Sequence, residues 1–243
     1  MHMNFYGRLK NKYRRFAIEN LALYASLTFG LGWLLMSTSV GASVYTRYLM
    51  FFPQEVLHGQ IWRILTAFLY PPFAGSSIFM ALLGIYIYYN FASVVERVMG
   101  AFDFNVYFFG SFLVGELGSI LYYLISGNDL PYLPVYTQFA VFMAFAILYP
   151  DTQVLLMFIL PIKTKYLALA ELAIYLYNFI VGDGFGRMFG MLYTRINIIA
   201  ALIPIAIFYL CVYHGQGGGN IIDNIRWKMH QRRRRKEWKD QWR

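Results

Sequence analysis

Residues 135–149, VYTQFAVFMAFAILY, form a mostly apolar run that stops at Pro150 and Asp151. A helix of this length is roughly 22 Å long at about 1.5 Å per residue, whereas a helix that crosses a bilayer needs about 20 residues. One end of this helix must therefore lie below the membrane surface. Irregular backbone is tolerated at that depth only when it is buried in protein or lines a water-filled cavity. The run predicts a short, submerged helix beside a cavity.

Apolar runs of membrane-span character flank this segment on both sides. The chain is 59% hydrophobic and 14% charged, with a mean hydropathy of +0.47, whereas a soluble domain is about 25% charged. We therefore predict an all-α membrane protein, a six-transmembrane helical bundle. The expected spans are residues 21–40, 77–95, 104–125, 135–149, 166–181 and 196–213. The expected domains are a basic N-terminal segment, 1–20, a membrane domain, 21–214, and a basic tail, 215–243.

Two further segments are expected to lie at the membrane surface. Residues 41–75 mix prolines and charged residues with short apolar runs, a pattern typical of amphipathic structure in the interface. Residues 152–160 are apolar, but they are followed by Lys163 and Lys165, which resist burial in a bilayer.

The distribution of basic residues predicts the orientation. An even number of spans places both termini on one side of the membrane. Seventeen of the 21 Lys and Arg residues then lie on the side of the termini and four on the other. Because cytoplasmic segments carry the excess of Lys and Arg, both termini are expected to be cytoplasmic.

Three segments carry a resemblance to a known family. Residues 59–68, GQIWRILTAF, resemble the first-loop signature of the rhomboid superfamily. Glu96-Arg97 at the end of the second run and residues 146–156, AILYPDTQVLL, are similar to the corresponding rhomboid segments. The resemblance implies a rhomboid-like six-span fold. The chain looks most similar to bacterial rhomboid-like proteins, which implies a bacterial plasma membrane.

The same resemblance implies that catalysis is lost. Active rhomboids are intramembrane serine proteases with a Ser at the start of the fourth span, a His on the sixth and hydrogen-bond donors on the second. Residues 129–146 contain no Ser and no Gly, and Thr137 is the only hydroxyl besides the tyrosines. The sixth run has no His before His214, and the second-span donors fall near Met80 and Gly84. A hydroxyl without a base is a poor nucleophile, so we interpret the chain as a non-catalytic pseudoprotease.

The function that follows is the binding or regulation of client membrane proteins through their transmembrane helices. One alternative is an active rhomboid-type peptidase with an unrecognised nucleophile such as Thr137. A second is a small-solute or proton transporter that depends on Glu116. A third is a lipid-surface scaffold that acts through the tail.

Five residues are the candidate site residues. Trp62 and Arg63 form the fold-signature loop, where Arg is expected to brace loop carbonyl groups. Glu116, Gln138 and Glu171 lie inside expected spans, where ionisable residues are functional hypotheses by default and polar residues commonly join helices. Of these three, Gln138 is the strongest candidate for a functional contact because it lies in the short helix beside the expected cavity.

The expected partners are lipids and membrane helices. The basic tail is predicted to bind anionic lipid headgroups, and no nucleic acid is expected. No cluster of His, Cys or carboxylates has metal spacing, so no metal and no cofactor are predicted. The single cysteine, Cys211, excludes an intrachain disulfide.

Overall fold

In the computed structural model, the residues described are 12–71, 77–156, 160–182 and 190–214. The chain divides into two units, residues 1–205 and 206–243. Of the second unit, only residues 206–214 are described, and they form the end of the last helix. The basic tail, residues 215–243, lies outside the described residues, as does most of the N-terminal basic segment.

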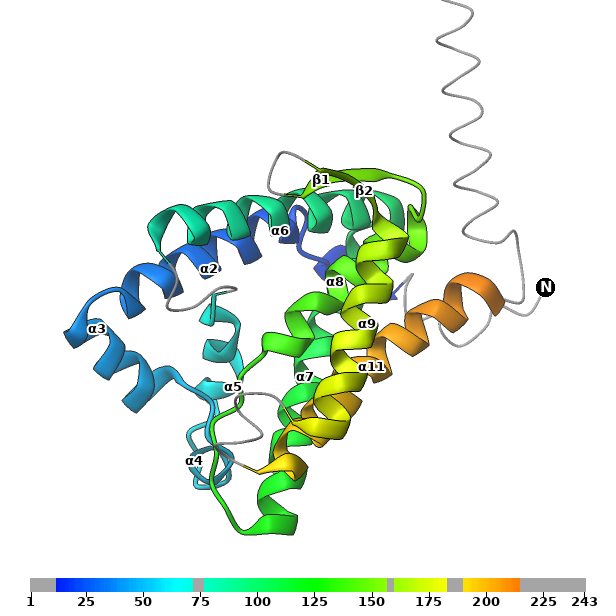
Figure 1. The fold of residues 1–243 in the computed structure, drawn as a ribbon. Helices are drawn as coiled ribbons and strands as arrows, with labels where there is room; N and C mark the ends of the chain where they lie inside the picture. Colours follow the sequence, from blue (N-terminus) through cyan, green and yellow to red (C-terminus); the bar gives the residue numbers. More distant parts are fainter. Residues whose placement is uncertain (1–11, 72–76, 157–159, 183–189, 215–243) are drawn as a thin grey trace, which may run out of the picture. The chain divides into compact units, whose positions relative to one another are not determined.

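Each of the six long apolar runs forms a helix (Figure 1). These helices are α2 (Leu21–Met36), α6 (Ile78–Met99), α7 (Ala101–Ser126), α8 (Val135–Leu148), α9 (Thr164–Val181) and α11 (Met191–His214). In the described part of the chain, four helices are long and apolar enough to cross a membrane, and they contain α2, α6, α7 and α11. Because α8 is short and α9 does not reach the same hydropathy, the count of six spans stays a prediction.

Helix α8 lies among α6, α7 and α9 and packs against all three. Most of its side chains are buried, including Ala140, Val141 and Ala144. Apolar residues cover all sides of α8 rather than one stripe, which is the pattern of a helix enclosed by others. The short run therefore forms an inner helix of the first unit.

The loop before α8 runs back along the bundle from the end of α7 (Figure 1). Tyr132 N donates to Phe51 O at 2.9 Å, and the hydroxyl of Tyr193 donates to Pro131 O at 2.7 Å. The Tyr132 hydroxyl also bonds Thr137 Oγ1 at 2.7 Å. This irregular backbone is thus enclosed by protein, which is the condition for placing it at membrane depth.

Short helices form the end of the expected first span, after residue 36, and the segment that follows it. Helix α2 ends at Met36, earlier than residue 40, because Thr38 begins a new helix by accepting a hydrogen bond from Gly41 N at 3.1 Å. The elements that follow are α3 (Ser39–Val44), the π-helix η2 (Tyr45–Leu49), α4 (Pro53–Leu57), α5 (Trp62–Thr66) and the 3-10 helix η3 (Ala67–Leu69).

A hairpin follows α8 where a surface segment is expected. Strand β1 (Gln153–Leu156) pairs antiparallel with β2 (Leu160–Lys163). Asp151, just before the hairpin, lies 3.0 Å from Lys165 Nζ and 3.8 Å from Lys163 Nζ. The hydrogen bond from Lys165 and the positive charge of both lysines hold the pKa of Asp151 below its ordinary value.

Helix α2 begins on side chains from α6 and α7. Glu96, near the end of α6, accepts hydrogen bonds from Leu21 N and Ala22 N, both at 2.9 Å. Asn105 of α7 bonds both Ile18 N and Ile18 O. A carboxylate at a helix N-terminus satisfies free N–H groups and complements the helix dipole. These contacts join α2 to the α6–α7 turn at Gly100, whose φ of 87° favours glycine.

Two glycines of α7 provide a matched test of the packing around Tyr132. A methyl group on Gly115 would lie 2.1 Å from the Tyr132 hydroxyl oxygen, whereas one on Gly110 meets nothing within 4 Å. We expect Gly115→Ala to displace Tyr132 and lower the stability by about 1–3 kcal/mol. Gly110→Ala is expected to leave stability unchanged or raise it by about 0.5–1 kcal/mol, because alanine favours helix. Thermal unfolding of both variants in detergent measures this difference, and equal midpoints would contradict the packing.

Candidate functional site

A cavity of about 610 Å³ lies among α6, α8 and α9. Its walls are mainly apolar side chains, with a few polar ones and with Tyr70 and Pro71 from the segment after η3. The α6 wall includes Gly84 and Phe91, the α8 wall Gln138 and Phe142, and the α9 wall Leu167 and Ile174. The cavity thus adjoins the short helix, where the sequence analysis expects it.

The cavity is open on the side where α6 and α9 form its edges. Ile87 of α6 is 39% exposed and Ile174 of α9 is 51% exposed, and both line the cavity. On α8, by contrast, Val141 is only 3% exposed and forms the floor. The opening is therefore bordered by exposed apolar side chains.

Gln138 is the polar residue that α8 contributes to the cavity. It is 6% exposed, and its Nε2 donates to Tyr70 O at 2.5 Å. This bond joins α8 to the irregular segment after η3, whose carbonyl would otherwise lack a partner at this depth. Burial raises the pKa of the Tyr70 hydroxyl above its ordinary value, so the hydroxyl stays protonated at neutral pH.

Two other polar side chains, Glu171 and Tyr88, come from the walls. Glu171 of α9 lies one turn before Tyr175, whose hydroxyl donates to Tyr136 O at 2.9 Å. Tyr88 of α6 is 8% exposed, and its hydroxyl has no hydrogen-bond partner in the part of the chain that the structure describes. A buried, unpaired hydroxyl costs free energy, and because this oxygen is enclosed, Tyr88 contributes its ring to the cavity wall.

Thr137 is buried, at 3% exposed, and its hydroxyl bonds the Tyr132 hydroxyl. Burial raises the pKa of Tyr132, so this neighbour is a protonated phenol and not a general base. His58, at the end of α4, is exposed, contacts Gln54 O through its Nδ1 and does not line the cavity. Thr137 is also absent from the residues that line the cavity.

Trp62 and Arg63 donate hydrogen bonds to carbonyl groups at the end of the π-helix η2. Arg63 is 3% exposed and donates to Arg47 O at 2.6 Å and to Met50 O at 2.5 Å. Trp62 Nε1 donates to Tyr48 O at 3.1 Å. Thr66, one turn later, donates to Leu49 O at 2.6 Å. Four consecutive carbonyl groups at a helix C-terminus thus receive side-chain donors, and neither Trp62 nor Arg63 lines the cavity.

Glu116 lies away from the cavity. It is 3% exposed within α7, and its Oε1 has no partner among the described residues. Its neighbour Gly115 packs closely against the Tyr132 side chain. The structure therefore brings Gln138 and Glu171 together at the cavity and places Trp62, Arg63 and Glu116 elsewhere.

The sequence analysis missed the α6 wall and Tyr88. Tyrosines are frequent in this chain, with 21 in the sequence, so no single one stands out. The signal that was available is the spacing of Gly84, Tyr88 and Phe91, which places all three on one helical face.

The sequence matches the family described as "Eukaryotic integral membrane protein" (DUF1751) over residues 20–202. Neither a curated protein nor a solved structure matches the chain. With the helices described above, the family match confirms the prediction of an all-α membrane protein that crosses the membrane several times.

The eukaryotic family overturns the identification of the chain as a bacterial rhomboid-like protein, and with it the bacterial plasma membrane. The error has a physical origin. A Trp-Arg pair that satisfies loop carbonyls and a short helix inside a bundle are solutions to membrane burial, and bilayers of bacteria and eukaryotes impose the same demand. Such features do not distinguish the source of a protein.

Arg63 and Arg47 provide a matched pair, one buried and one exposed. Arg63→Ala is expected to destabilise the protein by about 3 kcal/mol, because two helix-terminal carbonyls lose a charged donor. Arg47→Ala removes the same side chain from an exposed position and should change stability by less than about 0.5 kcal/mol. Thermal unfolding in detergent compares them. Similar midpoints for both variants would show that the carbonyl contacts contribute little.

Proposed function

The chain belongs to the eukaryotic integral membrane protein family (DUF1751), and we propose that it binds a transmembrane helix of a client protein at the cavity among α6, α8 and α9, without cutting it. The observation that carries the proposal is the open, mainly apolar side of this cavity, which contains Gln138 and Glu171.

The position of the cavity favours an occupant within the membrane. Its edges, α6 and α9, are apolar helices with exposed side chains such as Leu82 and Leu169, which suit a hydrocarbon surrounding. A helix that lay across the opening would place its side chains into the space between the two edges. Transmembrane helices associate through such close van der Waals packing.

The polar groups favour a helix over a lipid chain. Gln138 and Glu171 bring a carboxamide and a carboxyl to one cavity. An acyl chain returns no hydrogen bond to them, whereas a Ser, Thr, Asn or Gln on a client helix does. Such interhelical hydrogen bonds contribute about 0.6–2 kcal/mol each in membranes, so the site would select clients that carry a polar residue at this depth.

The surroundings of Thr137 support binding without cleavage. Its hydroxyl is buried and already paired with Tyr132, and a hydroxyl nucleophile needs an adjacent base. Both termini are proposed to face the cytoplasm of a eukaryotic cell, since most Lys and Arg residues then lie on that side.

Photo-crosslinking tests the binding site with two positions on α9. Ile174 lines the cavity and is 51% exposed, whereas Leu176 is 62% exposed and does not line it. With a photoreactive residue in eukaryotic membranes, position 174 is expected to give a discrete protein adduct and position 176 none. Mass spectrometry should map the adduct to a transmembrane segment of the client.

Filling the cavity is the control for this experiment. Ala170→Trp, on the same wall, should abolish the adduct at position 174 because the ring occupies the space of the client side chain. Equal adducts at both positions, or an adduct that survives Ala170→Trp, would contradict the proposal. An adduct to lipid alone would mean that the cavity holds a lipid chain and not a client helix.

Reconstitution tests whether the protein cuts. We expect liposomes that contain the purified protein and labelled single-span substrates to yield no fragments by mass spectrometry, while an active rhomboid cuts the same panel. Specific fragments that survive repurification and disappear in Thr137→Val would establish the peptidase alternative instead.

A further inference from the structure

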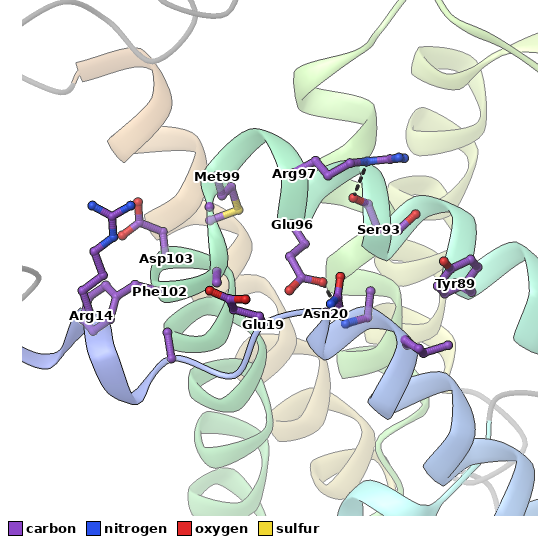
Figure 2. A pocket seen from close by; sticks show the side chains of 15 residues that line it. Arg14, Glu19, Asn20, Tyr89, Ser93, Glu96, Arg97, Met99, Phe102 and Asp103 are labelled. Carbon is purple, nitrogen blue, oxygen red and sulfur yellow. Dashed lines mark hydrogen bonds between the residues drawn. The ribbon is translucent and has the colours of Figure 1, made fainter.

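A second cavity, of about 640 Å³, lies where α2 begins, α6 ends and α7 begins (Figure 2). These three helices are among the candidate membrane spans. Because spans begin and end near the membrane surface, a cavity at their joint ends lies at the level of the lipid headgroups. The polar groups that line it therefore face the region of phosphate and ammonium groups.

Opposite charges line this cavity without being paired to each other. Arg97 Nε donates to Ser93 O at 3.1 Å, and its two terminal nitrogens have no partner among the described residues. Glu19 likewise makes no hydrogen bond or ion pair within the described part of the chain. Both side chains are exposed, and Figure 2 shows them at the same cavity.

Three further charged residues line the cavity: Glu96, Arg14 and Asp103. Glu96 differs from Glu19 and Arg97 because it already has partners. It is 8% exposed, and its two oxygens accept the hydrogen bonds from the start of α2. Asp103 also has a partner, and Arg14 is a second exposed cation at the cavity. Glu19 and Arg97 are thus an anion and a cation that a ligand can reach (Figure 2). A ligand that satisfies both needs an anionic and a cationic group.

Apolar side chains continue the cavity toward the spans. Leu23 of α2 is 44% exposed and Tyr89 of α6 is 38% exposed, and both line the cavity. They follow Glu19 and precede Arg97 by one to two helical turns, so they lie on the hydrocarbon side of the charges. A lipid matches this arrangement, because its charged headgroup lies at the membrane surface and its acyl chains lie in the hydrocarbon.

We propose that this cavity binds a phosphatidylethanolamine headgroup, with the phosphate at Arg97, the primary ammonium at Glu19 and the acyl chains along Leu23 and Tyr89. An anionic headgroup without an amine offers nothing to Glu19 and is repelled by the carboxylates. A choline headgroup carries a cation that has no N–H to donate. The cavity is separate from the one among α6, α8 and α9, so this inference is independent of the proposed function.

Native mass spectrometry of the purified full chain tests the inference. The detergent-solubilised protein is mixed in turn with ethanolamine, choline and glycerol phospholipids of identical acyl chains. We expect the ethanolamine lipid to be retained best. Arg97→Ala should lower its occupancy roughly fivefold, the effect of about 1 kcal/mol for one basic residue near a membrane surface. Glu19→Gln should remove the preference for ethanolamine over phosphatidylglycerol.

Arg195→Ala is the matched control. Arg195 is exposed and donates its Nε to Phe179 O at 3.0 Å, as Arg97 does to Ser93 O, but it does not line the cavity. This variant should retain the ethanolamine lipid as the wild type does, and Arg97→Lys should retain most of it because the charge remains. Thermal midpoints verify that the variants are folded.

Three results would overturn the inference. Equal retention of the three lipids would mean non-selective contact with the protein surface. Preferential retention of phosphatidylglycerol by the wild type would mean that Arg97 acts without Glu19. A loss in Arg195→Ala equal to that in Arg97→Ala would mean that the lipid binds elsewhere.

Discussion

The structure depends on one constraint: backbone groups without access to water must find hydrogen-bond partners inside the protein. This chain meets the constraint with side chains at the places where helices stop. Arg63, Trp62 and Thr66 supply donors to the end of η2, and Glu96 supplies acceptors to the start of α2. Each of these contacts joins segments distant in sequence, so satisfying the backbone also fixes which helices lie together.

The same constraint explains the cavity beside α8. A helix of 14 residues leaves its preceding loop inside the bundle, and that loop is held by bonds to Phe51, Tyr193 and Thr137. Gln138 Nε2 then donates to the carbonyl of Tyr70, which belongs to the segment after η3. A short central helix flanked by longer ones leaves space that its own side chains do not fill. The polar residues that hold the backbone there become polar residues of the cavity.

The sequence predicts the helices well because the length of each apolar run can be read from consecutive residues. The runs that become α6, α7 and α8 differ from their predicted bounds by a few residues, and the short α8 correctly indicates a nearby cavity. Gln138 is predicted because a carboxamide in a short apolar run is conspicuous, and the structure places it at the cavity. Glu19 and Arg97 are not predicted, since they come to one cavity through the pairing of α2 with α6, which periodicity alone does not reveal. The bacterial assignment fails for a related reason, because motifs shaped by burial carry little information about source.

Glu96 and Arg97 illustrate how neighbouring residues of one helix acquire different roles. Near the end of α6 they point in directions about 100° apart. Glu96 therefore turns inward to the N–H groups of α2, whereas Arg97 remains exposed at the cavity. The inward residue stabilises the joint of three helices, and that joint shapes the cavity which the outward residue lines. The hydrogen bonds from α2 hold the carboxylate of Glu96, and within the described residues no ion pair joins it to Arg97. The contacts that cap the start of α2 thus leave Arg97 exposed at the cavity.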